Sequence, residues 1–132
     1  MNDLRERLLN VNEAGVYRLN CTADVLRDSV ARAGLLLLEA DQEHKYGKGE
    51  FLAAVAAAIH AHDWFGHNFD ALADALGDLS WLGASPGYVL LLSRTDDACG
   101  LHETDRDIVM QIFDDTVAYW RGKNKPFWVF LG

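Results

Sequence analysis

Three aspartates spaced four residues apart form the pattern in this sequence that most suggests a chemical role. Asp70, Asp74 and Asp78 lie within the stretch HDWFGHNFDALADALGDL. Side chains four residues apart stack along one side of an α-helix, where like charges repel by roughly 0.2–0.5 kcal/mol per pair. No Lys or Arg occurs between Lys48 and Arg94, so no neighbour in the sequence neutralises these acids. The pattern predicts a helix that carries uncompensated negative charge.

Such a charged helix face has three possible explanations. Asp70 and Asp74 could serve as paired catalytic carboxylates of a glycosidase or a metal-dependent hydrolase, although no nucleophile–base set accompanies them in the sequence. A solvated acidic surface is the simplest alternative. The stretch Trp64-Phe65-Gly66 precedes the helix, however, and aromatic anchors beside uncompensated charge are typical of protein interfaces. We therefore favour a protein-binding surface over the other two explanations.

Composition narrows the class of protein further. The chain has 132 residues and a net charge of −8, which argues against direct nucleic-acid binding because phosphates require a basic patch. Cys21 and Cys99 form no CxxC motif, and the histidines show no metal-ligand spacing, so we expect neither a metal nor a cofactor. The N-terminus lacks a signal-peptide pattern, and every apolar run is too short to span a bilayer. These features predict a single soluble domain in the cytoplasm.

Apolar runs that alternate with amphipathic segments predict an α/β domain with a small, mostly parallel sheet. The predicted strands are residues 16–19, 35–38, 88–92 and 127–131. The predicted helices are residues 23–33, 50–61 and 104–121, together with a helix that follows the turn at residues 64–66 and runs to residue 79. The helix that carries the aspartates is expected to turn Phe69, Leu72, Ala73 and Leu76 towards the core. Residues 81–87, with two glycines and a proline, are expected to form a loop.

The run WFGHNFDALAD, residues 64–74, resembles the barstar family of ribonuclease inhibitors. The family pattern is an aromatic pair, Gly, any residue, Asn, a hydrophobic residue and then Asp-Ala-Leu-x-Asp, and this run meets every fixed position. The resemblance covers residues 35–132, and residues 1–34 form an N-terminal extension of a strand and a helix packed on the same domain. It implies a barstar-like α/β fold, with a three-stranded parallel sheet packed with helices.

The resemblance also implies a function, which is inhibition of a basic ribonuclease by a protein that is not itself an enzyme. Acidic side chains of the inhibitor would take the place of the RNA phosphates in the nuclease active site. Ala73 stands where barstar has a large aromatic residue, which leaves the identity of the partner open. A barstar-like interaction protein with a partner other than a nuclease is the alternative. The implied partner-binding residues are Trp64, Gly66, Asp70, Ala73, Asp74 and Asp115.

Overall fold

The computed structural model describes residues 3–61, 68–95 and 99–132. A short 3-10 helix, Ser80–Leu82, overlaps the start of residues 81–87, which were expected to form a loop. The remaining elements, in chain order, are α1 (Asp3–Leu8), β1 (Val16–Arg18), α2 (Ala23–Ala33), β2 (Leu36–Asp41), α3 (Lys48–Ala58), α4 (Phe69–Leu76), β3 (Tyr88–Ser93), α5 (Glu103–Gly122) and β4 (Phe127–Leu131).

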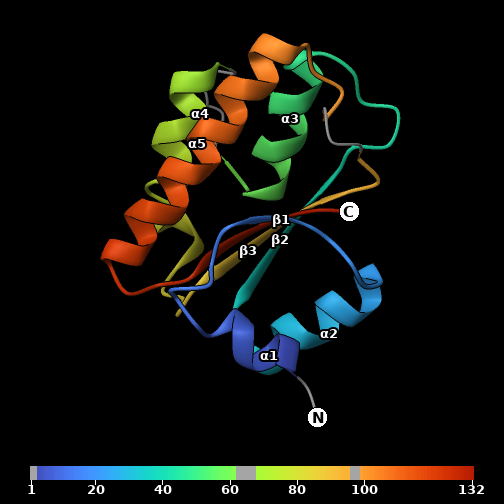
Figure 1. The fold of residues 1–132 in the computed structure, drawn as a ribbon. Helices are drawn as coiled ribbons and strands as arrows, with labels where there is room; N and C mark the ends of the chain where they lie inside the picture. The colour runs from blue at the N-terminus through green and yellow to red at the C-terminus, as the bar shows by residue number, and fades with distance from the viewer. Residues whose placement is uncertain (1–2, 62–67, 96–98) are drawn as a thin grey trace.

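These elements form three layers, with the sheet in the middle. Figure 1 shows α3, α4 and α5 on one side of the sheet and α1 and α2 on the other. All five residues of β4 and all six of β3 are buried. A parallel sheet covered by helices on both faces requires strands that are apolar throughout, which explains the continuous apolar runs in the sequence.

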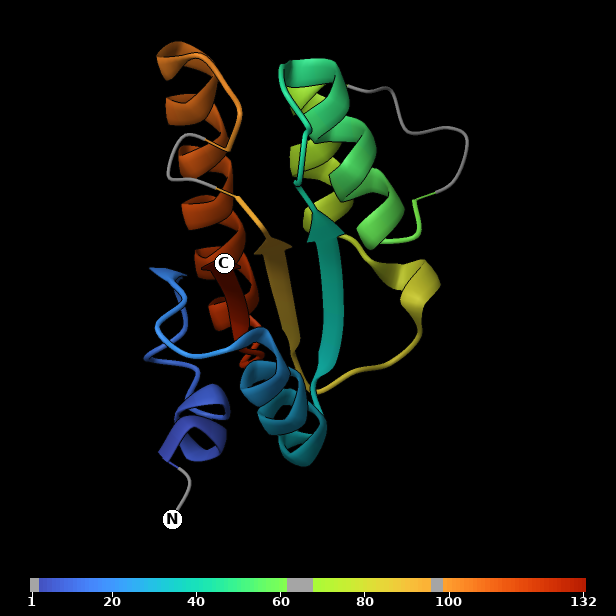
Figure 2. The same cartoon turned by 90° about the vertical axis from the view of Figure 1, so that its right-hand side faces the viewer.

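The sheet has the strand order β1-β4-β3-β2, and every pairing is parallel. Figure 2 shows β2 and β3 as neighbouring arrows that point the same way. The predicted three-stranded sheet is wrong by one strand, because Val16 pairs with Val129 and places β1 beside β4. This pairing satisfies backbone groups of β4 that would otherwise form an open edge of the sheet.

The N-terminal residues pack closely against the rest of the chain. Trp128 on β4 donates a hydrogen bond of 2.9 Å from its indole Nε1 to the carbonyl oxygen of Leu8, at the end of α1. Arg121 on α5 donates to the carbonyl oxygens of Val11 and Ala14. The helix α1 was not expected from the sequence.

Within the described residues, no helix has the length and apolar character needed to cross a membrane.

Candidate functional site

The helix α4 begins at a side-chain cap and has one buried face. The side-chain oxygen of Asn68 accepts a hydrogen bond of 2.7 Å from the backbone N–H of Ala71, which fixes the first turn. Leu72, Ala75 and Leu76 are buried towards the core. Asp70 lies in the first turn of this helix, where the helix dipole favours a negative charge.

The opposite face of α4 is exposed and carries the acids predicted to bind a partner. Asp70 and Asp74 are both exposed, and Ala73 lies exposed between them in the sequence. The prediction that Ala73 faces the core is therefore wrong, because Ala75 takes the buried position. Phe69 is only half-buried, and the ammonium of Lys48 lies 4.6 Å from the centre of its ring.

Asp78 does not belong to this helical face. The helix ends at Leu76, and Gly77 is its C-terminal cap. Asp78 lies beyond the cap and accepts a hydrogen bond of 3.3 Å from the backbone N–H of Ser80. The predicted stack of three aspartates therefore reduces to the pair Asp70 and Asp74.

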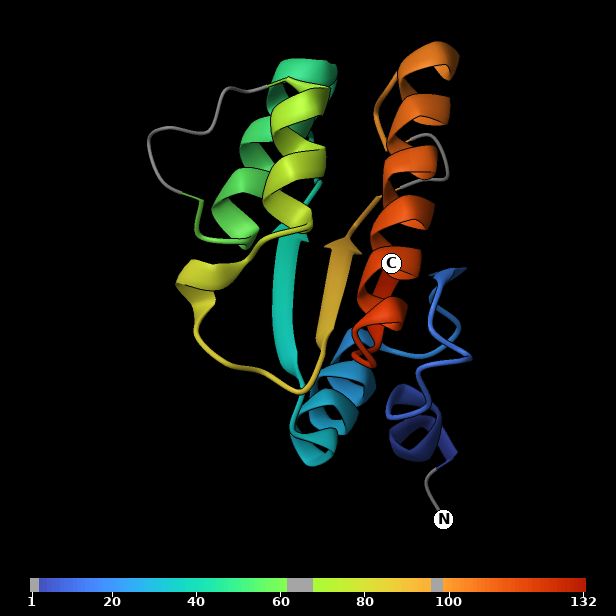
Figure 3. The same ribbon diagram turned by 90° about the vertical axis from the view of Figure 1, so that its left-hand side faces the viewer.

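A groove between α4 and α5 brings Ala73 and Asp115 together, as Figure 3 shows for the two helices. It encloses about 270 Å³, and Tyr119, 46% exposed, lines it from α5. Asp115 is exposed and accepts a hydrogen bond of 2.9 Å from the amide of Gln111. The full lining is Ala73, Gly77, Ile112, Asp115, Thr116 and Tyr119.

The sequence did not predict four of the groove residues, namely Gly77, Ile112, Thr116 and Tyr119. Ile112 and Tyr119 are seven residues apart, with Asp115 between them, so all three share one side of α5. That spacing was a usable signal, although the apolar pattern of residues 104–121 predicts a core position for Ile112. Its half-buried side chain instead lies at the boundary between the core and the groove.

The two acids of α4, Asp70 and Asp74, have no basic side chain paired with them among the described residues. By contrast, Glu39 on β2 lies 2.7 Å from the guanidinium of Arg27 on α2. The Glu39 carboxylate is thus neutralised, while those of Asp70 and Asp74 remain available to an external cation.

Two predicted contact residues, Trp64 and Gly66, lie outside the described residues. The structure therefore places four of the six predicted residues, and Ala73 and Asp115 line one groove. Within the described segments, no group of three or more His, Cys, Asp or Glu side chains could hold a metal ion.

Comparison with protein families supports the resemblance seen in the sequence. A family model described as Barstar (barnase inhibitor) matches residues 35–132. The matched region includes α4, α5 and the groove between them. A search of curated proteins finds no match.

Proposed function

We propose that this chain, which belongs to the barstar family, inhibits a basic ribonuclease by covering its active site with the exposed face of α4. The observation that carries this proposal is the pair Asp70 and Asp74, exposed on one helix and unpaired within the described residues. Ala73 and Asp115 extend the same surface across the groove to α5.

The distribution of charge supports a cationic partner for this surface. Residues 1–34 carry five Arg and five acidic side chains, so they contribute no net charge. Residues 35–132 carry 7 Lys and Arg side chains against 15 acidic ones, which accounts for the whole net charge of −8. Fields of opposite sign accelerate the encounter of two proteins and suppress wrong partners.

The mechanism is occlusion of the active site. A ribonuclease active site gathers cationic hydrogen-bond donors for phosphate, and a carboxylate can satisfy the same donors. Asp70 and Asp74 are one turn apart on a capped helix, so their backbone positions are already set before binding. Such preorganisation reduces the entropy lost on association. Because the helix presents no phosphodiester bond, the nuclease has nothing to cleave.

The proposed function can be tested by titrating RNA cleavage. A panel of basic microbial ribonucleases, with barnase among them, would be assayed on a fluorescent RNA substrate with increasing amounts of the purified chain. We expect cleavage by at least one nuclease to fall to zero near one equivalent of the chain, and higher RNA concentrations to relieve partial inhibition. Unchanged cleavage across the panel would count against the proposal.

The small residues of the groove favour one alternative, a barstar-like protein whose partner is not a nuclease. Ala73 and Gly77 leave open a groove where barstar has a large aromatic side chain, so the contact surface has a different shape. Affinity capture with the purified chain from a cytoplasmic extract, followed by an RNA-cleavage assay on the captured protein, distinguishes the two. Capture of a protein without nuclease activity would favour the alternative, provided that the Asp74→Ala variant no longer captures it.

A further inference from the structure

The groove between α4 and α5 has walls that are mostly apolar. Ala73 and Gly77, one turn apart, form the α4 wall, and Ile112 and Tyr119 form much of the α5 wall. Thr116, the most deeply buried of the lining residues, donates a hydrogen bond of 2.8 Å from its hydroxyl to the carbonyl oxygen of Ile112. That hydroxyl proton is therefore not available to a polar ligand, and the groove favours an apolar occupant.

The size and shape of the groove suit a flat ring. Ile112 and Tyr119 are seven residues apart, which separates them by roughly 10 Å along the axis of α5. The groove volume of about 270 Å³ exceeds the roughly 150 Å³ at which an apolar protein cavity already binds benzene. The opposite wall carries only the methyl group of Ala73 and the backbone of Gly77. A planar side chain can therefore lie lengthwise between the two helices.

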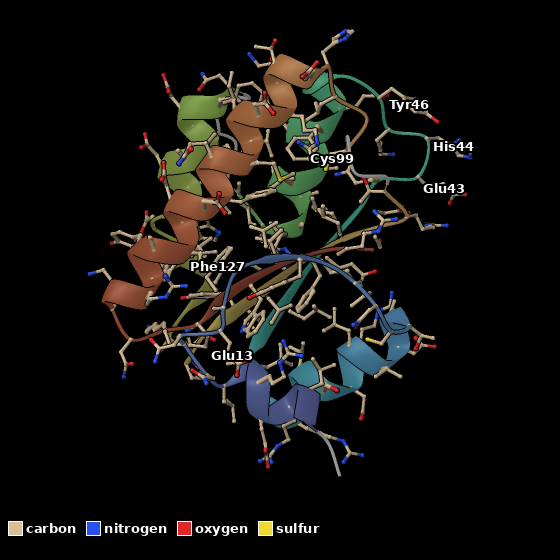
Figure 4. The ribbon with its side chains drawn as sticks, in the orientation of Figure 1. Glu13, Glu43, His44, Tyr46, Cys99 and Phe127 are labelled. Carbon is tan, nitrogen blue, oxygen red and sulfur yellow. The ribbon has the colours of Figure 1, made fainter. Side chains whose placement is uncertain are left out.

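Aromatic contacts connect the wall of the groove to the core. The ring of Tyr119 lies edge-on to that of Trp120, with ring centres 5.2 Å apart, and Trp120 contacts Tyr88 of β3 at 5.1 Å. Tyr88 also contacts Phe127 of β4, which lies on the α5 side of the sheet (Figure 4). Aromatic rings prefer tilted and edge-to-face contacts of this kind. A further ring in the groove would extend the cluster beyond Tyr119, its most exposed member.

Exposed acidic side chains adjoin the groove on both helices. Asp115 lines it directly from α5. On α4, Asp70 lies three residues before Ala73 and therefore adjoins it on the helix surface. Asp74 adjoins Gly77 in the same way. A mostly apolar groove flanked by carboxylates is complementary to an apolar side chain that has basic residues on either side.

We propose that the groove receives an aromatic side chain of the basic protein partner, a Trp, Tyr or Phe with basic residues on either side. The inference rests on the proposed function for the nature of that partner, a ribonuclease. The ring packs between Ala73 and Tyr119, while its basic neighbours face Asp74 and Asp115. Aromatic anchors in desolvated pockets contribute much of the binding energy of protein interfaces. The groove thereby favours, among basic nucleases, those with an aromatic side chain beside the active site.

Filling the groove from within the chain itself tests this proposal. The affinity of Ala73→Trp for a ribonuclease that the parent chain inhibits would be compared with that of the parent. Because the added ring takes the space of the partner's ring, we expect binding at least about tenfold weaker. Ala31→Trp, at an exposed position of α2 on the other side of the sheet, is the matched control and should bind like the parent. Binding by Ala73→Trp that equals or exceeds the parent's would overturn the proposal.

A second test uses the parent chain, labelled with ¹⁵N, and needs no nuclease. The probe is the tripeptide Lys-Trp-Lys with blocked ends, and Lys-Ala-Lys and Glu-Trp-Glu are its controls. We expect saturable shifts of the backbone amide signals of Ala73, Gly77 and Thr116 with millimolar Lys-Trp-Lys, and much weaker binding of both controls. No saturable shift, or equal binding of Lys-Ala-Lys, would overturn the proposal even if the chain inhibits a ribonuclease. Selective binding of Lys-Trp-Lys supports the groove proposal, and unchanged RNA cleavage would then count against the proposed function alone.

Discussion

The indole Nε1 of Trp120 donates a hydrogen bond of 2.8 Å to the carbonyl oxygen of Leu76. Leu76 is the last residue of α4, and Trp120 lies near the end of α5. The last carbonyl groups of a helix have no partner within the helix, so the indole satisfies one of them and joins the two helices. This bond therefore helps to hold in place the two helices that carry Ala73 and Asp115.

Trp120→Phe should reduce the stability of the fold. The substitution removes the indole N–H and leaves a buried carbonyl group unpaired, which costs about 1–3 kcal/mol. Urea unfolding measures this loss as a lower midpoint. Tyr119→Phe is the matched control, because Tyr119 is exposed, and it should stay within about 0.5 kcal/mol of the parent chain. Equal stability of the two variants would show that the Trp120 bond contributes nothing measurable.

The strands of the core could be predicted from the sequence because burial on both faces requires continuous apolar runs. Residues 88–92 and 127–131 are strands in the structure, and Leu36–Asp41 begins one residue later and extends three residues beyond the prediction. The match to the barstar family model confirms the resemblance read from the run at residues 64–74.

Other features depend on contacts between distant parts of the chain. The place of β1 in the sheet follows from its pairing with β4, more than a hundred residues later. Asp78 was placed on the helix because four-residue spacing continues through Gly77, whereas the helix ends before that glycine. The face of Ala73 was misjudged because Ala73 and Ala75 have the same hydrophobicity, and only packing distinguishes them. The division of the chain at residue 34 stays a prediction.

Gly100→Ala should destabilise the fold more than Gly83→Ala does. Both glycines have a positive φ, near 71° and 81°, which costs an L-residue roughly 1–2 kcal/mol. A Cβ at Gly100 would also lie 2.4 Å from the carbonyl oxygen of Lys45, whereas a Cβ at Gly83 meets nothing within 4 Å. Thermal unfolding of both variants measures the difference. A smaller loss of Tm for Gly100→Ala than for Gly83→Ala would contradict the close packing of Gly100 against the backbone of Lys45.

The pair of Arg27 and Glu39 predicts a pH-dependent contribution to stability. The hydrogen bonds from Arg27 hold the pKa of Glu39 below its ordinary value. A carboxylate with a lowered pKa in the folded state stabilises the fold above its unfolded pKa, about 4.3, and loses this effect as the pH falls through the folded value. Arg27→Gln should therefore lower the urea midpoint at pH 7, with the difference shrinking below about pH 4.

The control for this pH series is Arg32→Gln. Arg32 pairs with Asp28 on the exposed surface of the same helix, so its removal should change stability little at any pH. A difference in urea midpoint between Arg27→Gln and the parent chain that stays constant across the pH range would show that the pair with Arg27 does not lower the pKa of Glu39.

Substitutions in α2 test whether the N-terminal residues fold as part of one unit. Leu26 is fully buried, and Leu26→Ala should cost about 2–5 kcal/mol of global stability. Val25, the adjacent residue, is 48% exposed, and Val25→Ala should change stability by less than about 0.5 kcal/mol. The measurement is urea unfolding followed by the fluorescence of the four tryptophans. A separate early transition confined to Leu26→Ala would indicate independent unfolding of residues 1–34.

The affinity of Asp74→Ala for a ribonuclease that the parent chain inhibits tests the proposed function most directly. Truncating one member of a desolvated charge pair weakens the free energy of binding by about 2–5 kcal/mol. The complexes from which this range comes include barnase–barstar itself. Asp28→Ala removes the same charge from α2, on the opposite side of the sheet, and serves as the control. We predict a loss of at least about thirtyfold for Asp74→Ala and little change for Asp28→Ala. Equal affinities of the two variants, measured by calorimetry, would contradict occlusion by the acidic face of α4.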